Sequence, residues 1–235
     1  MNYSVKVTPI TSKEGSNMKG FATVVFGESF KITNIAILEN KGNKKLFISM
    51  PRYKSSEQDE RGGSIYKDVC NPITTEFREK LYTDILEAYE KSITPEQEKN
   101  QGNEKRVEDS IEMPEFSVVV SPFEREGSYV RGLARIYFDN SFIVNNVSLL
   151  QGKETIFVSM PSYKTKQVDE YGKAIYQDIC YPVTKEFREK LYTEIIKEYE
   201  QALEKNQKKS GTREDMDKQK ANGEKKQEKE RTPFR

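Results

Sequence analysis

The sequence predicts an α+β protein of two tandem units, each an antiparallel β-meander with one C-terminal helix, paired as a pseudo-dimer. Three observations support this prediction. Long segments recur at an offset of 110 residues, which becomes 112 upstream of residue 46, apolar residues alternate with period two through each copy, and the spacing becomes helical near the end of each copy. The stretch L-F-I-S-M-P-R-Y-K from Leu46 returns as I-F-V-S-M-P-S-Y-K from Ile156, and residues 46–91 match residues 156–201 at 26 of 46 positions.

The first part of each copy reads as strands, because apolar and polar residues alternate there. Pro51 closes one of these strands, since proline cannot donate to a ladder. The strands expected in the first unit are a segment around Val5 and Val7, Gly20–Phe26, Phe30–Leu38, Leu46–Met50 and the short returning strand Ile65–Val69. We expect long polar loops from Arg52 to Gly63 and from Ser162 to Gly172.

The third strand has a local irregularity that occurs in both copies. Phe30 and Ile32 occupy one parity, whereas the next apolar residues, Ile35 and Ile37, occupy the other. Val144 and Val147 repeat the slip in the second copy. Since one extra residue in a strand shifts the side-chain parity, the pattern predicts a β-bulge at Asn34 and at Asn146.

The helix of each unit is predicted from apolar residues four positions apart. Thr74 and Thr184 are suitable N-caps, and Glu76 and Glu186 lie in the first turn, where a carboxylate favours the helix dipole. The apolar stripe comprises Phe77, Leu81, Ile85 and Tyr89 in the first unit and Phe187, Leu191, Ile195 and Tyr199 in the second.

The domain organisation follows from the repeat and from composition. We expect units at residues 1–91 and 114–203, a polar linker at 92–113 and a disordered charged tail at 204–235. One helix covers only one face of a small sheet, which leaves edges open to pairing. The duplication would make that pairing intramolecular, so we expect a covalent pseudo-dimer; the sequence leaves open whether it assembles further.

Composition excludes several classes of function. The chain of 235 residues has no histidine and only two cysteines, so imidazole metal sites, His-based catalysis and a disulfide framework are not expected. It contains no nucleotide-binding or hydrolase motif, so we expect no enzyme, cofactor, metal or catalytic residue. With 39 basic and 38 acidic residues, the charge shows no global preference for nucleic acid. No signal peptide or membrane span is evident, so we expect a cytoplasmic protein.

Two sets of residues could carry function. Cys70 and Cys180 precede X-Pro at the junction of strand and helix, and packing as small buried residues explains them better than reactivity does. The loops after M-P could form a basic rim in which Tyr53 and Tyr163 stack on nucleic acid. Because acidic residues are interleaved, the residues alone favour a merely solvated loop. The rim comprises Arg52, Lys54, Arg61 and Lys67 in one copy and Lys164, Lys166 and Lys173 in the other.

The start of each helix adds further cations. Arg78 and Arg188 flank the apolar stripe and could contact phosphate near a helix N-terminus. The alternative is an ordinary amphipathic helix with intrahelical pairs such as Glu76–Lys80 and Glu186–Lys190, and the two interpretations do not exclude each other.

The order of motifs is similar to that of the SpoVG family, the bacterial septation and stage V sporulation regulators. In both halves a strand F-x-[IV]-x-[ND]-[IV] leads to L-F-[IV]-x-M-P-like residues, then Y-x-D-[IV]-x-x-P-[IV]-T, then a helix with R-E-K. The resemblance implies a regulator that binds DNA, and in some members RNA, and that acts on septation, sporulation or gene expression. Carried over, the contact residues are Arg52, Lys54, Arg78 and Lys80, with Lys164, Lys166, Arg188 and Lys190 in the second copy.

This sequence departs from the family pattern in two places. The basic segment after M-P is R-Y-K-S and S-Y-K-T, and the family's A-H-P-I becomes C-N-P-I and C-Y-P-V. The alternative to a DNA-binding regulator is a non-enzymatic protein-interaction module that has lost DNA binding and recruits partners through open sheet edges.

Overall fold

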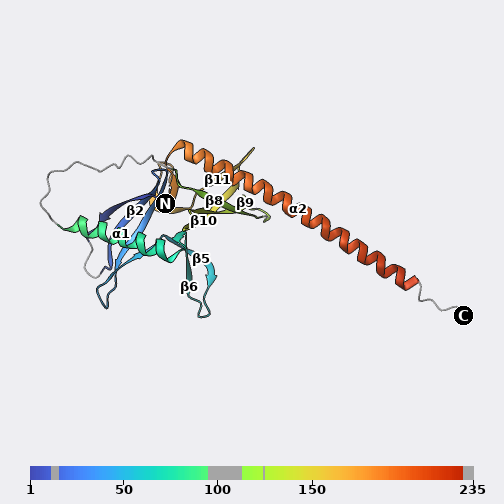
Figure 1. The fold of residues 1–235 in the computed structure, drawn as a ribbon, viewed down its shortest axis with the longest axis horizontal. Helices are drawn as coiled ribbons and strands as arrows, with labels where there is room; N and C mark the ends of the chain where they lie inside the picture. The colour runs from blue at the N-terminus through green and yellow to red at the C-terminus, as the bar shows by residue number, and fades with distance from the viewer. Residues whose placement is uncertain (12–15, 95–112, 124, 230–235) are drawn as a thin grey trace.

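The computed structural model describes residues 1–11, 16–94, 113–123 and 125–229, and it shows the predicted α+β fold with two similar units (Figure 1). The elements of the first unit are β1 (Tyr3–Pro9), β2 (Met18–Phe26), β3 (Phe30–Glu39), β4 (Leu46–Ser49), β5 (Arg52–Gln58), β6 (Ser64–Asp68), β7 (Cys70–Pro72) and α1 (Thr75–Ile93). Those of the second are β8 (Phe116–Pro122), β9 (Val130–Phe138), β10 (Phe142–Gln151), β11 (Ile156–Ser159), β12 (Ser162–Val168), β13 (Ala174–Asp178), β14 (Cys180–Pro182) and α2 (Lys185–Lys229).

The predicted β-bulges are confirmed in both sheets. The register of β2 with β3 shifts between Ala22 and Val24, and that of β9 with β10 shifts between Val144 and Val147. Asn34 and Asn146 adopt positive φ values of 60° and 58°. Asparagine tolerates this left-handed conformation better than most residues, which explains why it stands at the bulge in both copies.

Each helix begins and packs as the sequence predicts. The Thr74 and Thr184 hydroxyls accept hydrogen bonds at 3.3 Å from the backbone N–H groups of Phe77 and Phe187. The stripe of each helix faces its own sheet, where Leu81 and Ile85 are fully buried. The helices therefore close one face of each sheet, and the opposite face remains open to solvent.

The two units pair by exchanging one short strand each. β7 of the first unit adds to β10 of the second, with Cys70 opposite Val144, and β14 of the second adds to β3 of the first, with Cys180 opposite Ile32. The exchange is reciprocal in its flanking hydrogen bonds: Asn145 N–H donates to Val69 O at 2.7 Å, and Thr33 N–H donates to Ile179 O at 2.8 Å. The predicted pseudo-dimer is thus one body joined by two sheets of mixed origin.

A shared aromatic core reinforces this pairing. Phe26 of β2 lies 5.1 Å from Phe142 of β10, and Phe30 of β3 lies 4.7 Å from Phe138 of β9, measured between ring centroids. All four rings are fully buried. Because aromatic rings contribute large apolar areas to a core, removing either unit would expose much of what stabilises the other.

The two cysteines lie within this junction. Cys70 and Cys180 are free and fully buried, as predicted for packing residues. A hydrogen bond with the Cys180 thiol and burial away from water raise the pKa of Cys70 well above its ordinary value. A thiol that remains protonated is a poor nucleophile, so this pair fits packing rather than reactivity.

The expected polar loops are in fact β-ribbons, which corrects the sequence prediction. β5 pairs with β6, and β12 pairs with β13, as two separate two-stranded sheets (Figure 1). Nearly every ribbon residue is exposed. Strands without a buried face lack the apolar alternation that marks strands in a sequence, so these segments resembled loops.

Helix α2 extends through Lys229, into the segment 204–235 for which composition predicts a disordered charged tail. Its Lys, Glu and Gln residues are good helix formers, so the composition that suggested disorder is also compatible with a helix. Residues 95–112 of the predicted linker and residues 230–235 lie outside the described part of the chain.

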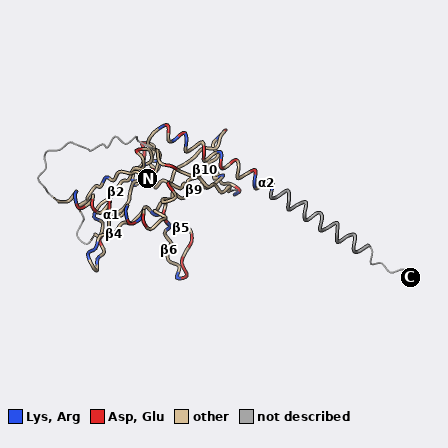
Figure 2. Tube along the Cα trace, viewed as in Figure 1, with Lys and Arg blue, Asp and Glu red and all other residues tan. Residues whose placement is uncertain are grey.

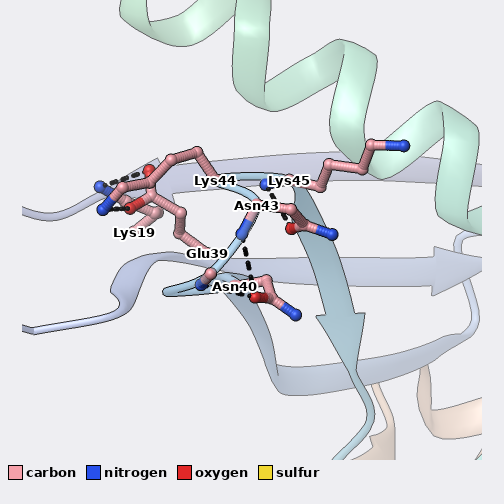
Figure 3. Close-up of polar contacts among 7 residues, drawn as sticks. Lys19, Glu39, Asn40, Asn43, Lys44 and Lys45 are labelled. Carbon is pink, nitrogen blue, oxygen red and sulfur yellow. Dashed lines mark hydrogen bonds and ion pairs between the residues drawn. The ribbon is translucent and has the colours of Figure 1, made fainter.

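The turn between β3 and β4 differs in length between the copies, and in the first copy it is held by local polar contacts (Figure 3). Asn40 Oδ1 accepts a hydrogen bond from Gly42 N–H at 2.8 Å. Glu39 pairs with Lys19 at 3.1 Å and with Lys44 at 3.6 Å. The hydrogen bond from Lys19 is the main cause that lowers the pKa of Glu39.

Candidate nucleic-acid interface

The two ribbons leave the body at the junction between the units. The carbonyl of Asp68, the last residue of β6, accepts a hydrogen bond from the Asn145 side chain of the second unit at 3.4 Å. Thr33 Oγ1 donates to the Asp178 and Ile179 carbonyls at the base of the other ribbon, at 3.5 and 3.0 Å. The strand exchange between the units therefore fixes the base of each ribbon. The direction in which each ribbon leaves the body follows from that anchoring.

Strand register assigns the ribbon side chains to faces. In the first ribbon Arg52 is opposite Asp68, Tyr53 opposite Lys67 and Lys54 opposite Tyr66. In the second, Tyr163 is opposite Gln177 and Lys164 opposite Tyr176. Since alternate residues of a strand share a face, Lys54 and Tyr66 lie on the face that also carries Arg52 and Asp68.

One aspartate at each ribbon tip accepts hydrogen bonds from the backbone of the turn. Asp59 Oδ1 accepts hydrogen bonds from the N–H groups of Arg61 and Gly63, at 2.9 and 2.6 Å. Asp169 Oδ1 accepts equivalent bonds from Tyr171 and Lys173, at 2.9 and 2.8 Å. These two carboxylates therefore hold the turns at the ribbon tips.

Two cations of the first ribbon already have partners. Lys67 Nζ lies 2.7 Å from Glu57 Oε1, and this hydrogen bond raises the pKa of Lys67. Arg52 donates to Ser49 Oγ at 2.9 Å, and its Nε lies 4.0 Å from Asp68 Oδ1. Burial raises the pKa of Asp68, and the nearby guanidinium groups of Arg52 and Arg78 oppose that rise.

Three predicted contact residues remain available. Lys54, Lys164 and Lys166 are exposed, and among the described residues none of them forms an ion pair with a carboxylate. In the second ribbon Gln167 stands at the position of Glu57. The second ribbon therefore has no carboxylate equivalent to the one that pairs with Lys67 in the first ribbon. An exposed ammonium group without an acidic partner is suited to a phosphate.

The helix arginines lie close to the ribbon bases. Arg78 Nη2 donates to Pro72 O and Arg188 Nη2 to Pro182 O, both at 3.2 Å. Burial raises the pKa of Tyr192, which Arg188 lowers and Asp178 raises, so both charged groups act on that phenol. Arg52 and Arg78 thus lie near Asp68 in the first unit.

The helix lysines point to another part of the molecule. Lys80 Nζ donates to Tyr3 Oη at 3.0 Å and to Asp84 Oδ2 at 2.9 Å, and these bonds raise the pKa of Lys80. Lys190 Nζ lies 5.7 Å from the centre of the Phe116 ring. Both lysines therefore contact the first strand of their unit, β1 or β8, rather than the ribbon.

Two ribbon tyrosines were not among the residues predicted from the sequence. Tyr66 and Tyr176 are 59% and 63% exposed, whereas Tyr53 and Tyr163, which we considered for stacking, are 36% and 37% exposed. The alternation of I-Y-K-D within the returning strand was a visible signal. Its meaning depends on the pairing with β5, which the sequence did not indicate.

Other features of the described residues do not suggest a different site. No three His, Cys, Asp or Glu side chains gather there as metal ligands would, and no helix of that part is long and apolar enough to cross a membrane. Basic and acidic residues are interleaved along the described trace (Figure 2). A groove of about 500 Å³ lies between α2 and β11, lined mainly by Ile156, Phe157, Tyr192 and Ile196.

Comparison with known proteins identifies the family. The SpoVG family model matches the chain twice, over residues 1–91 and 113–201. The chain belongs to the SpoVG family. Each of the two matches covers one of the units in Figure 1, so this chain contains two SpoVG units in tandem.

Curated relatives are the length of one unit. Three of them, each named "Putative septation protein SpoVG", come from Clostridium beijerinckii (39% identity over 92 residues), Treponema denticola (39% over 85) and Phytoplasma australiense (37% over 76). The alignments cover 39%, 36% and 32% of this chain and 90%, 83% and 73% of the relatives. No solved structure matches the chain significantly.

Proposed function

We propose that this SpoVG-family chain is a cytoplasmic, non-enzymatic DNA-binding regulator of septation, sporulation or gene expression that acts as a covalent pseudo-dimer. The observation that carries the proposal is the pair of exposed ribbons whose lysines Lys54, Lys164 and Lys166 form no ion pair with a carboxylate among the described residues. A two-stranded ribbon is narrow enough to enter the major groove of DNA, and lysine ammonium groups bind phosphates.

The proposal separates the predicted contact residues by role. Lys54, Lys164 and Lys166 would bind phosphates directly. Arg52, Arg78 and Arg188 lie at the ribbon bases and would add positive charge there, although each already donates a hydrogen bond within the protein. Lys80 and Lys190 are engaged at β1 and β8, so we expect them to contribute little.

The test is a fluorescence anisotropy titration of the full chain with a labelled DNA fragment at two salt concentrations. We expect affinity to fall steeply with salt, and a triple variant K54A/K164A/K166A to bind more weakly across sequences. The matched control is K41A/K44A/K45A, which removes the same charge from the β3–β4 turn shown in Figure 3. Equal losses in both triple variants would mean that net charge, not the ribbons, governs binding.

A second candidate function has its own structural support. The sheets expose large apolar side chains, Phe21 and Phe47 in the first unit and Leu133 and Phe157 in the second. Exposed apolar patches often mark protein interaction sites. If the chain binds no DNA or RNA even at low salt, a protein-interaction module becomes the better proposal.

A further inference from the structure

Each ribbon places a lysine directly opposite a tyrosine that is more than half exposed. Register pairs Lys54 with Tyr66 and Lys164 with Tyr176. Side chains opposite each other in an antiparallel pair have Cβ atoms about 5 Å apart on the same face. The surrounding charges differ between the ribbons, because Arg52 becomes Ser162, Glu57 becomes Gln167 and Lys67 becomes Gln177, yet this lysine–tyrosine pair is the same in both.

Stabilising the ribbon does not account for these tyrosines. Tyr163, on the other face, is only 37% exposed and donates from its hydroxyl to Gln177 Oε1 at 2.8 Å, as expected of a tyrosine that holds two strands together. Tyr66 and Tyr176 are 59% and 63% exposed, and their hydroxyls have no hydrogen-bond partner in the part of the chain that the structure describes. Their rings therefore remain largely available to a ligand.

An aromatic ring beside an ammonium group is suited to a nucleotide whose base is free. The ring offers a flat face on which a base can stack, and the neighbouring lysine can bind a backbone phosphate. In a duplex both faces of a base are covered by adjacent bases, whereas unpaired bases can stack on protein side chains.

The net charge of the ribbons also favours a ligand with unpaired bases. Residues 52–68 contain four basic and four acidic residues, and residues 162–178 contain three of each. A ribbon with no net charge attracts a duplex only weakly through its phosphates, because that attraction scales with the number of phosphates neutralised. Stacking does not depend on net charge, so it can supply affinity that the ribbon charge does not.

We propose that the ribbons bind single-stranded nucleic acid, with unpaired bases stacking on Tyr66 and Tyr176 and the adjoining phosphates on Lys54 and Lys164. This inference rests on the proposed function, because it assumes that the ribbons are the nucleic-acid site. It adds the substrate class: unpaired DNA or RNA is preferred over duplex.

The test compares three labelled probes of one mixed sequence on the full chain: a 20-nucleotide single-stranded DNA, its duplex and the corresponding RNA. We expect at least one single-stranded probe to bind about tenfold more tightly than the duplex. Y66A/Y176A should lose about tenfold or more of that affinity, since each base that stacks contributes substantially. The matched variant Y66F/Y176F keeps the rings and should bind like the wild type.

The possible outcomes separate the two proposals. The single-strand inference is overturned if the duplex binds as tightly as the single strands, or if Y66A/Y176A keeps its single-strand affinity. The proposed function still holds in that case if K54A/K164A/K166A weakens binding. Failure to bind any probe overturns both. Circular dichroism of the tyrosine variants should match the wild type, because both rings are exposed. A difference in affinity between the single-stranded DNA and RNA probes identifies which of the two is the ligand.

Discussion

The two units share one fold, but their basic side chains have different partners. In the first unit Arg52 lies near Asp68, Lys67 pairs with Glu57, and Lys80 bonds Tyr3 and Asp84. In the second unit Ser162, Gln177 and Phe116 occupy the places of Arg52, Lys67 and Tyr3. The fold depends on the buried residues that both copies keep, so the surface charges of the copies were free to diverge.

The largest expected effect tests whether the units are one cooperative body. Phe142→Ala in the second unit removes a buried ring that contacts Phe26 and Phe77 of the first unit. We expect a loss of about 3–5 kcal/mol in unfolding free energy, and a similar loss for the equivalent Phe30→Ala. Urea unfolding followed by circular dichroism and tyrosine fluorescence should show one transition. Two separated transitions in the wild type would refute the shared core.

Nucleic-acid affinity should show the next largest difference between the units. K164A/K166A removes two lysines without acidic partners, whereas R52A/K54A removes one such lysine and one arginine already near Asp68. The slope of log affinity against log salt should therefore fall by about 2 in the first variant and about 1 in the second. Anisotropy titrations over a salt series measure both slopes, and equal changes would show that the ribbons bind alike.

A smaller effect is expected at the first strand. Tyr3 Oη donates to Asp84 Oδ2 at 2.6 Å, a bond that Phe116 cannot make in the second unit. Tyr3→Phe should lower the unfolding free energy by about 1 kcal/mol. The reverse change, Phe116→Tyr, should have no such benefit, because Glu194 stands at the position equivalent to Asp84 and already bonds Lys197. Chemical denaturation of both variants measures the two changes in unfolding free energy. Changes of equal size would contradict this difference between the units.

The smallest effect concerns the ribbon-base carboxylates. Burial raises the pKa of Asp178 and of Asp68 above the ordinary value of 3.8, and two arginines oppose the rise only at Asp68. A raised folded-state pKa means that stability falls as pH rises from the unfolded pKa through the folded pKa. Asp178→Asn should remove this fall and stabilise the protein slightly at neutral pH, more than Asp68→Asn does. Unfolding free energies at acidic and neutral pH would show it, and a larger gain from Asp68→Asn would contradict it.

Local signals accounted for most of the body of the fold. The parity slip located the bulges at Asn34 and Asn146, because side-chain alternation is a property of consecutive residues. The four-residue spacing and Thr74 located the helix start for the same reason. The candidate site was only partly predictable: the sequence indicated the cations but not which of them have acidic partners, since Lys67 and Glu57 meet only through strand pairing.

The sequence by itself determined that the chain contains two copies of one unit, that each copy has a meander of apolar strands followed by a helix, and which side of these elements is buried. These follow from repetition and from the periods of strand and helix. Only the tertiary structure decided the strand exchange at Cys70 and Cys180, the ribbons, and the placement of Lys54 opposite Tyr66. Three-residue strands and fully exposed ribbons have too little apolar pattern to be recognised, and the partners of their residues lie far away along the chain.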